Sequence, residues 1–164
     1  MDSKRLTKSL FYFYFIMLVW IILFKMQMPF SFVGHGRSIN LIPFAGSVIV
    51  DGRIYIQEIV DNVLIFIPFG VFSSMLGGAK SWIGRLAPSF FTSLALEVLQ
   101  FVLAVGATDI TDVMTNTFGG LIGMGVFCLF EKLFRENVCR VLNGIVLVGA
   151  VGMSFLIGVL LVAN

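Results

Sequence analysis

The chain has 164 residues, of which 59% are hydrophobic and 12% are charged, and its mean hydropathy is +1.03. Soluble globular domains are about 45–50% apolar and about 25% charged, so this composition excludes an ordinary soluble domain. The net charge of +2 is too small to indicate a nucleic-acid-binding protein. The composition therefore predicts an integral membrane protein whose mass lies mostly within the bilayer.

Apolar runs of about 20 residues predict transmembrane helices, because that length spans the hydrocarbon core. Five such runs follow one another, at about residues 9–28, 62–79, 82–105, 109–130 and 141–163. The first run is bulky and precedes no small-residue cleavage site, so we expect it to be a retained helix rather than a signal peptide. The sequence therefore predicts an all-α, polytopic helix bundle that forms one membrane domain over residues 1–164.

The distribution of lysine and arginine predicts the orientation of this bundle, because these residues favour the cytoplasmic side. With the N-terminus inside, the inner segments carry eight of them, namely Lys4, Arg5, Lys8, Lys80, Arg85, Lys132, Arg135 and Arg140. The outer segments carry three, namely Lys25, Arg37 and Arg53. The bias predicts an N-terminus inside, a C-terminus outside, and a long outer loop at residues 29–61.

The centre of this outer loop is too apolar for a free loop. Residues 38–44 read Ser-Ile-Asn-Leu-Ile-Pro-Phe and contain no charge. We expect this segment either to lie back on the outer leaflet or to dip between the helices.

Polar residues gather toward the outer ends of the expected helices. Glu97 and Gln100 are three residues apart and share one face of the third helix. One face of the fourth helix carries Asp109, Asp112 and Asn116. A tight outer turn at residues 106–108 makes these helices antiparallel neighbours, so we expect the two faces to form a cleft open to the outside.

The second and fourth helices carry further signals. Asp61 and Asn62 enter at the top of the second helix, and Pro68 favours a kink toward the cleft. Gly119 and Gly123 form a G-x-x-x-G pattern, which predicts close approach to a neighbouring helix.

The polar residues permit two interpretations. Ionisable groups within membrane spans are costly and usually functional, which favours a binding or catalytic cleft around Glu97. The alternative is a structural role, in which Glu97 and Gln100 bond Asn116 across the bundle. Asp109 and Asp112 are weak candidates for a divalent cation, but a carboxylate at a helix start more often caps the helix.

Five short motifs follow one another along the chain. The segments Asn40–Phe44, Asp61–Gly70, Glu97–Phe101, Gly106–Val113 and Asn116–Gly120 read NLIPF, DNVLIFIPFG, EVLQF, GATDITDV and NTFGG. In order and spacing they resemble the VanZ-like family, and the resemblance runs from the first helix through the fourth. It departs at Gly106, where many members of the family carry an arginine, so no role of that arginine carries over. The resemblance adds Asn40 to the candidate ligand-binding residues.

The resemblance implies a bacterial plasma-membrane protein linked to low-level teicoplanin resistance, but it implies no reaction. The first hypothesis is therefore a non-enzymatic factor that binds a lipid head group or part of the drug at the outer leaflet. The alternative is an intramembrane enzyme that modifies a lipid-linked cell-wall intermediate, with Glu97 as general acid or base. A small transporter or flippase is a third hypothesis.

The expected partners are membrane lipids, together with a lipid-linked cell-wall precursor or a lipoglycopeptide. We expect no cofactor and no nucleic acid, and the sequence leaves the oligomeric state open.

Overall fold

The computed structural model describes residues 3–24, 38–44, 49–50, 53–54, 56–77, 81–105 and 107–163. It contains five α-helices in these ranges, which are α1 (Ser3–Phe24), α2 (Ile56–Leu76), α3 (Trp82–Leu103), α4 (Ile110–Phe134) and α5 (Val138–Ala163). A short 3-10 turn at Arg135–Asn137 joins α4 to α5. The predicted all-α membrane bundle is confirmed.

The described residues contain four stretches that are long and apolar enough to cross a membrane, namely Ser3–Leu23, Ile56–Leu76, Trp82–Leu103 and Ile110–Gly152. The last stretch runs through α4 and into α5, so the exact number of spans remains a prediction. The ends of the expected first and second spans, together with Arg37, Lys80 and Gly106, lie outside the described residues.

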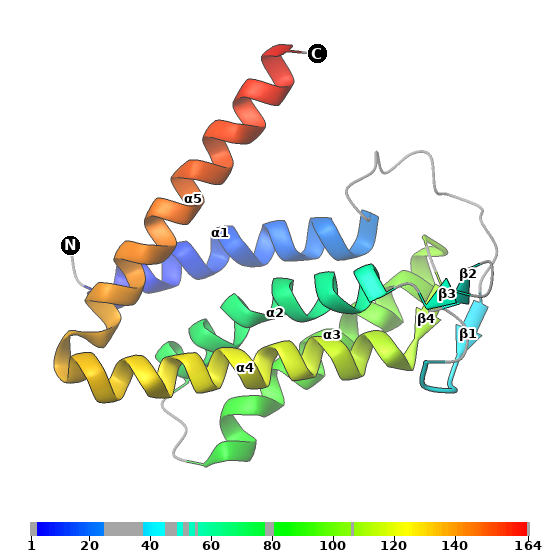
Figure 1. The fold of residues 1–164 in the computed structure, drawn as a ribbon, viewed down its shortest axis with the longest axis horizontal. Helices are drawn as coiled ribbons and strands as arrows, with labels where there is room; N and C mark the ends of the chain where they lie inside the picture. Colours follow the sequence, from blue (N-terminus) through cyan, green and yellow to red (C-terminus); the bar gives the residue numbers. More distant parts are fainter. Residues whose placement is uncertain are drawn as a thin grey trace.

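Helices α1 to α4 lie side by side, and α5 turns back at the end of α4 and leans away from them (Figure 1). One buried cluster joins Leu18 of α1, Phe66 and Phe69 of α2, and Leu96 of α3. A second cluster holds the start of α5 through Val71, Phe127, Val138 and Leu142.

Helices α2 and α4 touch backbone to backbone. A Cβ atom at Gly119 would overlap the carbonyl oxygen of Val63, and one at Gly123 would overlap that of Ile67. From the other side, a Cβ atom at Gly70 would overlap the carbonyl oxygen of Gly120. The glycine pattern of α4 therefore does permit a close helix–helix approach, as predicted, and the partner is α2.

Pro68 lies within α2, which continues through it from Ile56 to Leu76. Proline removes one backbone hydrogen bond from the turn that precedes it. In that turn the hydroxyl of Tyr14 on α1 donates to the carbonyl of Ile65. This contact ties α1 to α2 beside the carbonyl of Leu64, which is the group that Pro68 leaves without its helical donor.

Short strands complete the fold at the end of the bundle where α2 and α4 begin. Strand β1 (Ser38–Asn40) pairs in parallel with β4 (Ala107–Asp109), and β2 (Ile49–Val50) pairs antiparallel with β3 (Arg53–Ile54). The sequence analysis predicted a tight turn at residues 106–108 and no strand. The parallel pairing depends on residues far apart in the sequence, so local pattern gave no sign of it.

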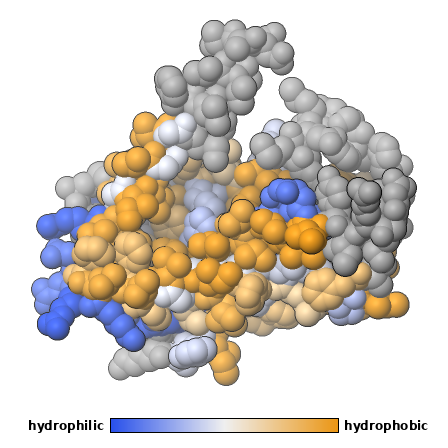
Figure 2. Space-filling view, in the orientation of Figure 1, coloured by the Kyte–Doolittle hydropathy of each residue, from blue (hydrophilic) through white to orange (hydrophobic). Residues whose placement is uncertain are grey.

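The described cationic side chains of the expected inner segments occupy the opposite end. They lie where α1 and α3 begin and where α4 meets α5, and the exposed ones are Lys4, Arg5, Lys8, Lys132, Arg135 and Arg140. Figure 2 shows hydrophilic residues gathered at this end, beside a largely hydrophobic surface over α4 and α5. This separation agrees with the predicted orientation, which itself remains a prediction.

Candidate functional site

A line of polar side chains follows one face of α3. Ser89, Ser93 and Glu97 are four residues apart and therefore stack on one side of the helix. All three are buried, and Glu97 is only 1% exposed. The face is directed at α4, because a Cβ atom at Gly120 of α4 would overlap the hydroxyl of Ser89.

Glu97 meets the start of α4. Its Oε2 atom accepts a hydrogen bond from the backbone N–H of Asp109 at 3.0 Å. The neighbouring hydroxyl of Thr108 donates to the backbone carbonyl of Glu97 at 3.2 Å. Backbone N–H groups at a helix start carry a partial positive charge, so this position suits a buried carboxylate.

Asp109 is the N-cap of α4. Its Oδ1 atom accepts from the backbone N–H of Thr111 at 2.7 Å, which satisfies one of the N–H groups that a helix start leaves unpaired. The capping role that the sequence favoured for Asp109 is therefore observed. Among the described residues, no group of three or more His, Cys, Asp or Glu side chains is placed to hold a metal ion.

Asn40 connects strand β1 to this cap. In the parallel pairing it stands opposite Asp109, and its Nδ2 atom donates to Oδ2 of Asp109 at 2.9 Å. Its Oδ1 atom accepts from the backbone N–H of Ile42 at 3.2 Å. Two residues further on, the backbone N–H of Phe44 donates to the hydroxyl of Thr111 at 3.0 Å. The segment from Asn40 to Phe44 is thus tied at both ends to the first turn of α4.

Asn116 lies deeper along the same interface. Its Nδ2 atom donates to the hydroxyl of Ser93 at 2.9 Å, and Asn116 is 1% exposed. Its Oδ1 atom is buried and has no hydrogen-bond partner among the described residues, and the same holds for the hydroxyl of Ser89. Buried polar atoms are normally satisfied, so this part of the interface suits an additional donor.

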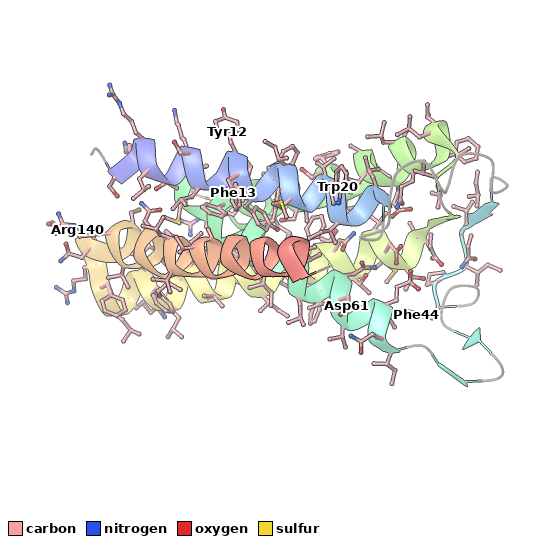
Figure 3. All side chains as sticks on the ribbon, turned by 90° about the horizontal axis from the view of Figure 1, so that it is seen from above. Tyr12, Phe13, Trp20, Phe44, Asp61 and Arg140 are labelled. Atoms are coloured by element: carbon pink, nitrogen blue, oxygen red, sulfur yellow. The ribbon has the colours of Figure 1, made fainter. Side chains whose placement is uncertain are left out.

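Two aspartates form the accessible side of the site. Asp112 is half-buried and accepts from Nδ2 of Asn62 on α2 at 2.7 Å. Asp61 is exposed and accepts from Gln57 one turn earlier on its own helix, at 2.9 Å. Asp61 and Phe44 lie toward the same end of the bundle (Figure 3).

Gln100 differs from the expectation that grouped it with Glu97. Its Nε2 atom donates to the backbone carbonyl of Ile22 on α1 at 2.8 Å. Residues three apart on a helix differ in direction by about 60°, since a helix has about 3.6 residues per turn. Glu97 therefore faces the start of α4, while Gln100 faces α1. Gln100 therefore joins α3 to α1.

The sequence predicted most of this site but not all of it. Three hydrogen-bonded groups lie along the start of α4, namely Asn40–Asp109–Glu97, Asn62–Asp112 and Ser93–Asn116, and we call these seven residues the polar cluster. The sequence analysis omitted Ser93, although its four-residue spacing from Glu97 places both on one face. Glu97, Asp109 and Asn116 are at most 3% exposed, so they are packed, and an open cleft around Glu97 stays a prediction.

Comparison with known proteins relates this arrangement to one family. Residues 11–131 match the sequence profile of the VanZ/LLP1 family, a range that includes every member of the polar cluster. The chain is 38% identical over 137 residues to Protein VanZ of Enterococcus faecium, which covers 82% of this chain and 81% of that protein. No solved structure matches the chain.

Proposed function

The chain belongs to the VanZ/LLP1 family, and we propose that it is a membrane protein conferring low-level resistance to teicoplanin through its polar cluster. The proposal places that cluster at the outer leaflet of a bacterial plasma membrane, where lipid-tailed glycopeptides anchor. The relative from Enterococcus faecium carries the VanZ name, and every member of the polar cluster except Ser93 lies in a motif that resembles the family.

The observation that carries this proposal is the burial of Glu97 within a membrane-spanning segment. A charge costs about 2.5–3.5 kcal/mol at the centre of a transmembrane helix on insertion scales and less toward its ends, and ionisable residues within spans are functional candidates by default. Glu97 lies toward the end of α3 and accepts from the start of α4, so part of that cost is offset by a charge-assisted hydrogen bond.

The chemistry of the cluster favours a ligand rich in hydrogen-bond donors. Carboxylate oxygens only accept hydrogen bonds when ionised, and amide oxygens only accept them. Hydroxyl, amide and ammonium groups supply such donors, and they occur in the head group of a lipid-linked cell-wall precursor and in a glycopeptide. Asn62 and Asp112 are half-buried, so they lie on the side that a ligand reaches first.

In this proposal the buried members position the accessible ones. Glu97 holds Asp109, and Asp109 holds both Asn40 and the first turn of α4, which carries Asp112. Ligand bound beside Asn62 and Asp112 would lower the amount of drug that reaches its target productively. No covalent bond is made or broken in this mechanism.

The test is expression of the protein in a susceptible host, with inhibitory concentrations measured for teicoplanin and for vancomycin, which lacks the lipid tail. We expect the inhibitory concentration of teicoplanin to rise and that of vancomycin to stay unchanged. An equal rise for both drugs, or no rise for either at confirmed membrane abundance, would overturn the proposal.

A further inference from the structure

The segment Ile39–Phe44, which we call the apolar turn, exposes all of its hydrophobic side chains. Ile39 is 56% exposed, Leu41 73%, Ile42 67% and Phe44 49%. The segment contains no charged residue. Of the two placements expected for residues 38–44, the exposure of these side chains argues against burial between the helices and leaves the placement on the leaflet.

The polar groups of the apolar turn are directed inward. Asn40 uses its amide to bond Asp109 and the backbone of Ile42, and the N–H of Phe44 bonds Thr111. Because these contacts hold the backbone against α4, the turn presents a fixed surface that is apolar on its outer side. A surface of this kind in contact with water is unusual in a soluble protein and marks a membrane or protein contact.

The attachment to α4 sets the depth of the apolar turn. The uncharged part of α4 runs from Val113 to Phe130, between Asp112 and Glu131. At about 1.5 Å per residue this segment is about 27 Å long, close to the ~30 Å thickness of the hydrocarbon core. Thr111, which accepts from Phe44, lies two positions before Val113. If the hydrocarbon core begins at Val113, the turn lies within a few ångströms of its boundary.

An aromatic side chain on α1 supports this depth. Trp20 lies one turn before the end of α1, in the half of that helix nearer to the strands, and it is about half exposed (Figure 3). Tryptophan is enriched where the hydrocarbon meets the head groups. The exposure of Trp20 therefore favours a lipid boundary toward this end of α1.

We propose that the apolar turn is inserted into the bilayer, with Leu41 and Ile42 among the lipid chains of the leaflet at the β1 end. At this depth the acyl chains of the lipid are the nearest apolar surroundings for these side chains. Segments that are polar on one side and apolar on the other bind at the boundary between head groups and acyl chains. The turn then acts as an interfacial anchor beside the polar cluster. This inference does not rest on the resistance function.

Spin labels at single cysteines test the insertion. Leu41→Cys, Ile42→Cys and the control Gln57→Cys would each be made with Cys128 and Cys139 replaced by serine. Gln57 is an exposed polar residue on the first turn of α2, at the same end of the bundle. The labelled proteins would be reconstituted in vesicles of phosphatidylglycerol and phosphatidylethanolamine, and their helix content would be checked by circular dichroism.

The measurement is the collision rate of each label with oxygen, which concentrates in lipid, and with a water-soluble nickel chelate. We expect the labels at 41 and 42 to collide several-fold less often with the chelate, and more often with oxygen, than the label at 57. Chelate accessibility at both positions equal to that at 57, in folded protein, would overturn the insertion. Measuring two positions keeps the test decisive if one variant fails to fold.

Discussion

The backbone N–H of Asp109 donates to the carboxylate of Glu97 at 3.0 Å, and this contact fixes the start of α4 against the last two turns of α3. An N-cap residue has no helical partner for its own N–H group, because the helix begins after it. Here a buried side chain from the preceding helix supplies the acceptor. The carboxylate is thereby tied to a position that stabilises negative charge, and α3 and α4 are joined near their connection.

Replacement of Glu97 by glutamine separates the functional role of this residue from its structural role. Glutamine retains the size and an acceptor oxygen for the N–H of Asp109 but lacks the charge and the ionisable proton. We expect membrane abundance on an immunoblot to stay near the wild-type level, while teicoplanin resistance is lost. Full resistance at normal abundance would make Glu97 a structural residue, because glutamine can replace it in an interhelical contact. Such contacts average only about 0.6 kcal/mol in a measured case, so the exchange would cost little.

Replacement of Asn40 should loosen the apolar turn. Asn40→Ala removes the bonds to Asp109 and to the N–H of Ile42, each worth about 1 kcal/mol. Asn40→Asp should be more damaging, since it sets a second carboxylate 2.9 Å from Oδ2 of Asp109. Hydrogen exchange at residues 40–44 measures the effect, and we expect it to be fastest in the aspartate variant and slowest in the wild type. Unchanged exchange in both variants would show that β1 pairing and the Phe44–Thr111 bond hold the turn without the Asn40 side chain.

The glycine contact between α2 and α4 should tolerate no side chain. Gly119→Ala places a methyl group against the carbonyl of Val63, and overpacking of this kind costs about 1–3 kcal/mol. Gly125 on the same helix is the matched control, because a Cβ atom there meets nothing within 4 Å. We expect thermal stability in detergent to fall for Gly119→Ala and to hold or rise for Gly125→Ala, since alanine favours helix. Equal melting temperatures for the two variants would contradict the close packing.

Sequence patterns at helical spacing predicted the parts of this molecule that depend on one helix at a time. Apolar length located the helices, and the Gly119 and Gly123 spacing predicted a close approach. Neither pattern identifies the partner helix, and the natural assumption favours the sequential neighbour α3. The glycines contact α2 instead, because which helices become neighbours depends on packing across the whole bundle.

In the site, too, residues on one helix could be predicted from their spacing, whereas contacts between distant parts of the sequence could not. Glu97, Asp109, Asp112 and Asn116 share faces that spacing alone predicts. The place of Asn40 depends on a parallel strand pair that spans about seventy residues of sequence, and only the family resemblance pointed to it. The expectation that Gln100 faces α4 together with Glu97 was wrong. The two side chains differ in direction by about 60°, which is enough for them to contact different helices, and Gln100 bonds α1.

The orientation of the bundle leads to a prediction about the C-terminus. The cationic side chains described at the α4–α5 end agree with that end lying inside, and one further span would then carry the C-terminus outside. A fusion after Asn164 to alkaline phosphatase should be active, while a fusion of green fluorescent protein there should be dark. Fluorescence at that position would mean that α5 does not cross the membrane.

The two accessible aspartates should differ in their effect on function. Asp112 is half-buried and bonded to Asn62 across the α2–α4 interface, whereas Asp61 is exposed and bonded within its own helix. If the ligand enters beside Asn62, then Asp112→Asn removes a charge that a ligand donor approaches closely, and charge-assisted hydrogen bonds are about twice as strong as neutral ones. Asp61→Asn removes a charge that water already screens.

We therefore expect Asp112→Asn to lower the teicoplanin inhibitory concentration nearly to the level of cells without the protein, and Asp61→Asn to retain most of the resistance. Both substitutions keep side-chain size, so membrane abundance on an immunoblot should match the wild type. Asn62→Ala provides a second test of the same position, because it removes the partner of Asp112 while leaving the charge in place. If Asp61→Asn proved the more damaging at equal abundance, the ligand would approach from the exposed side of α2, and the proposed role of the Asn62–Asp112 pair would be wrong.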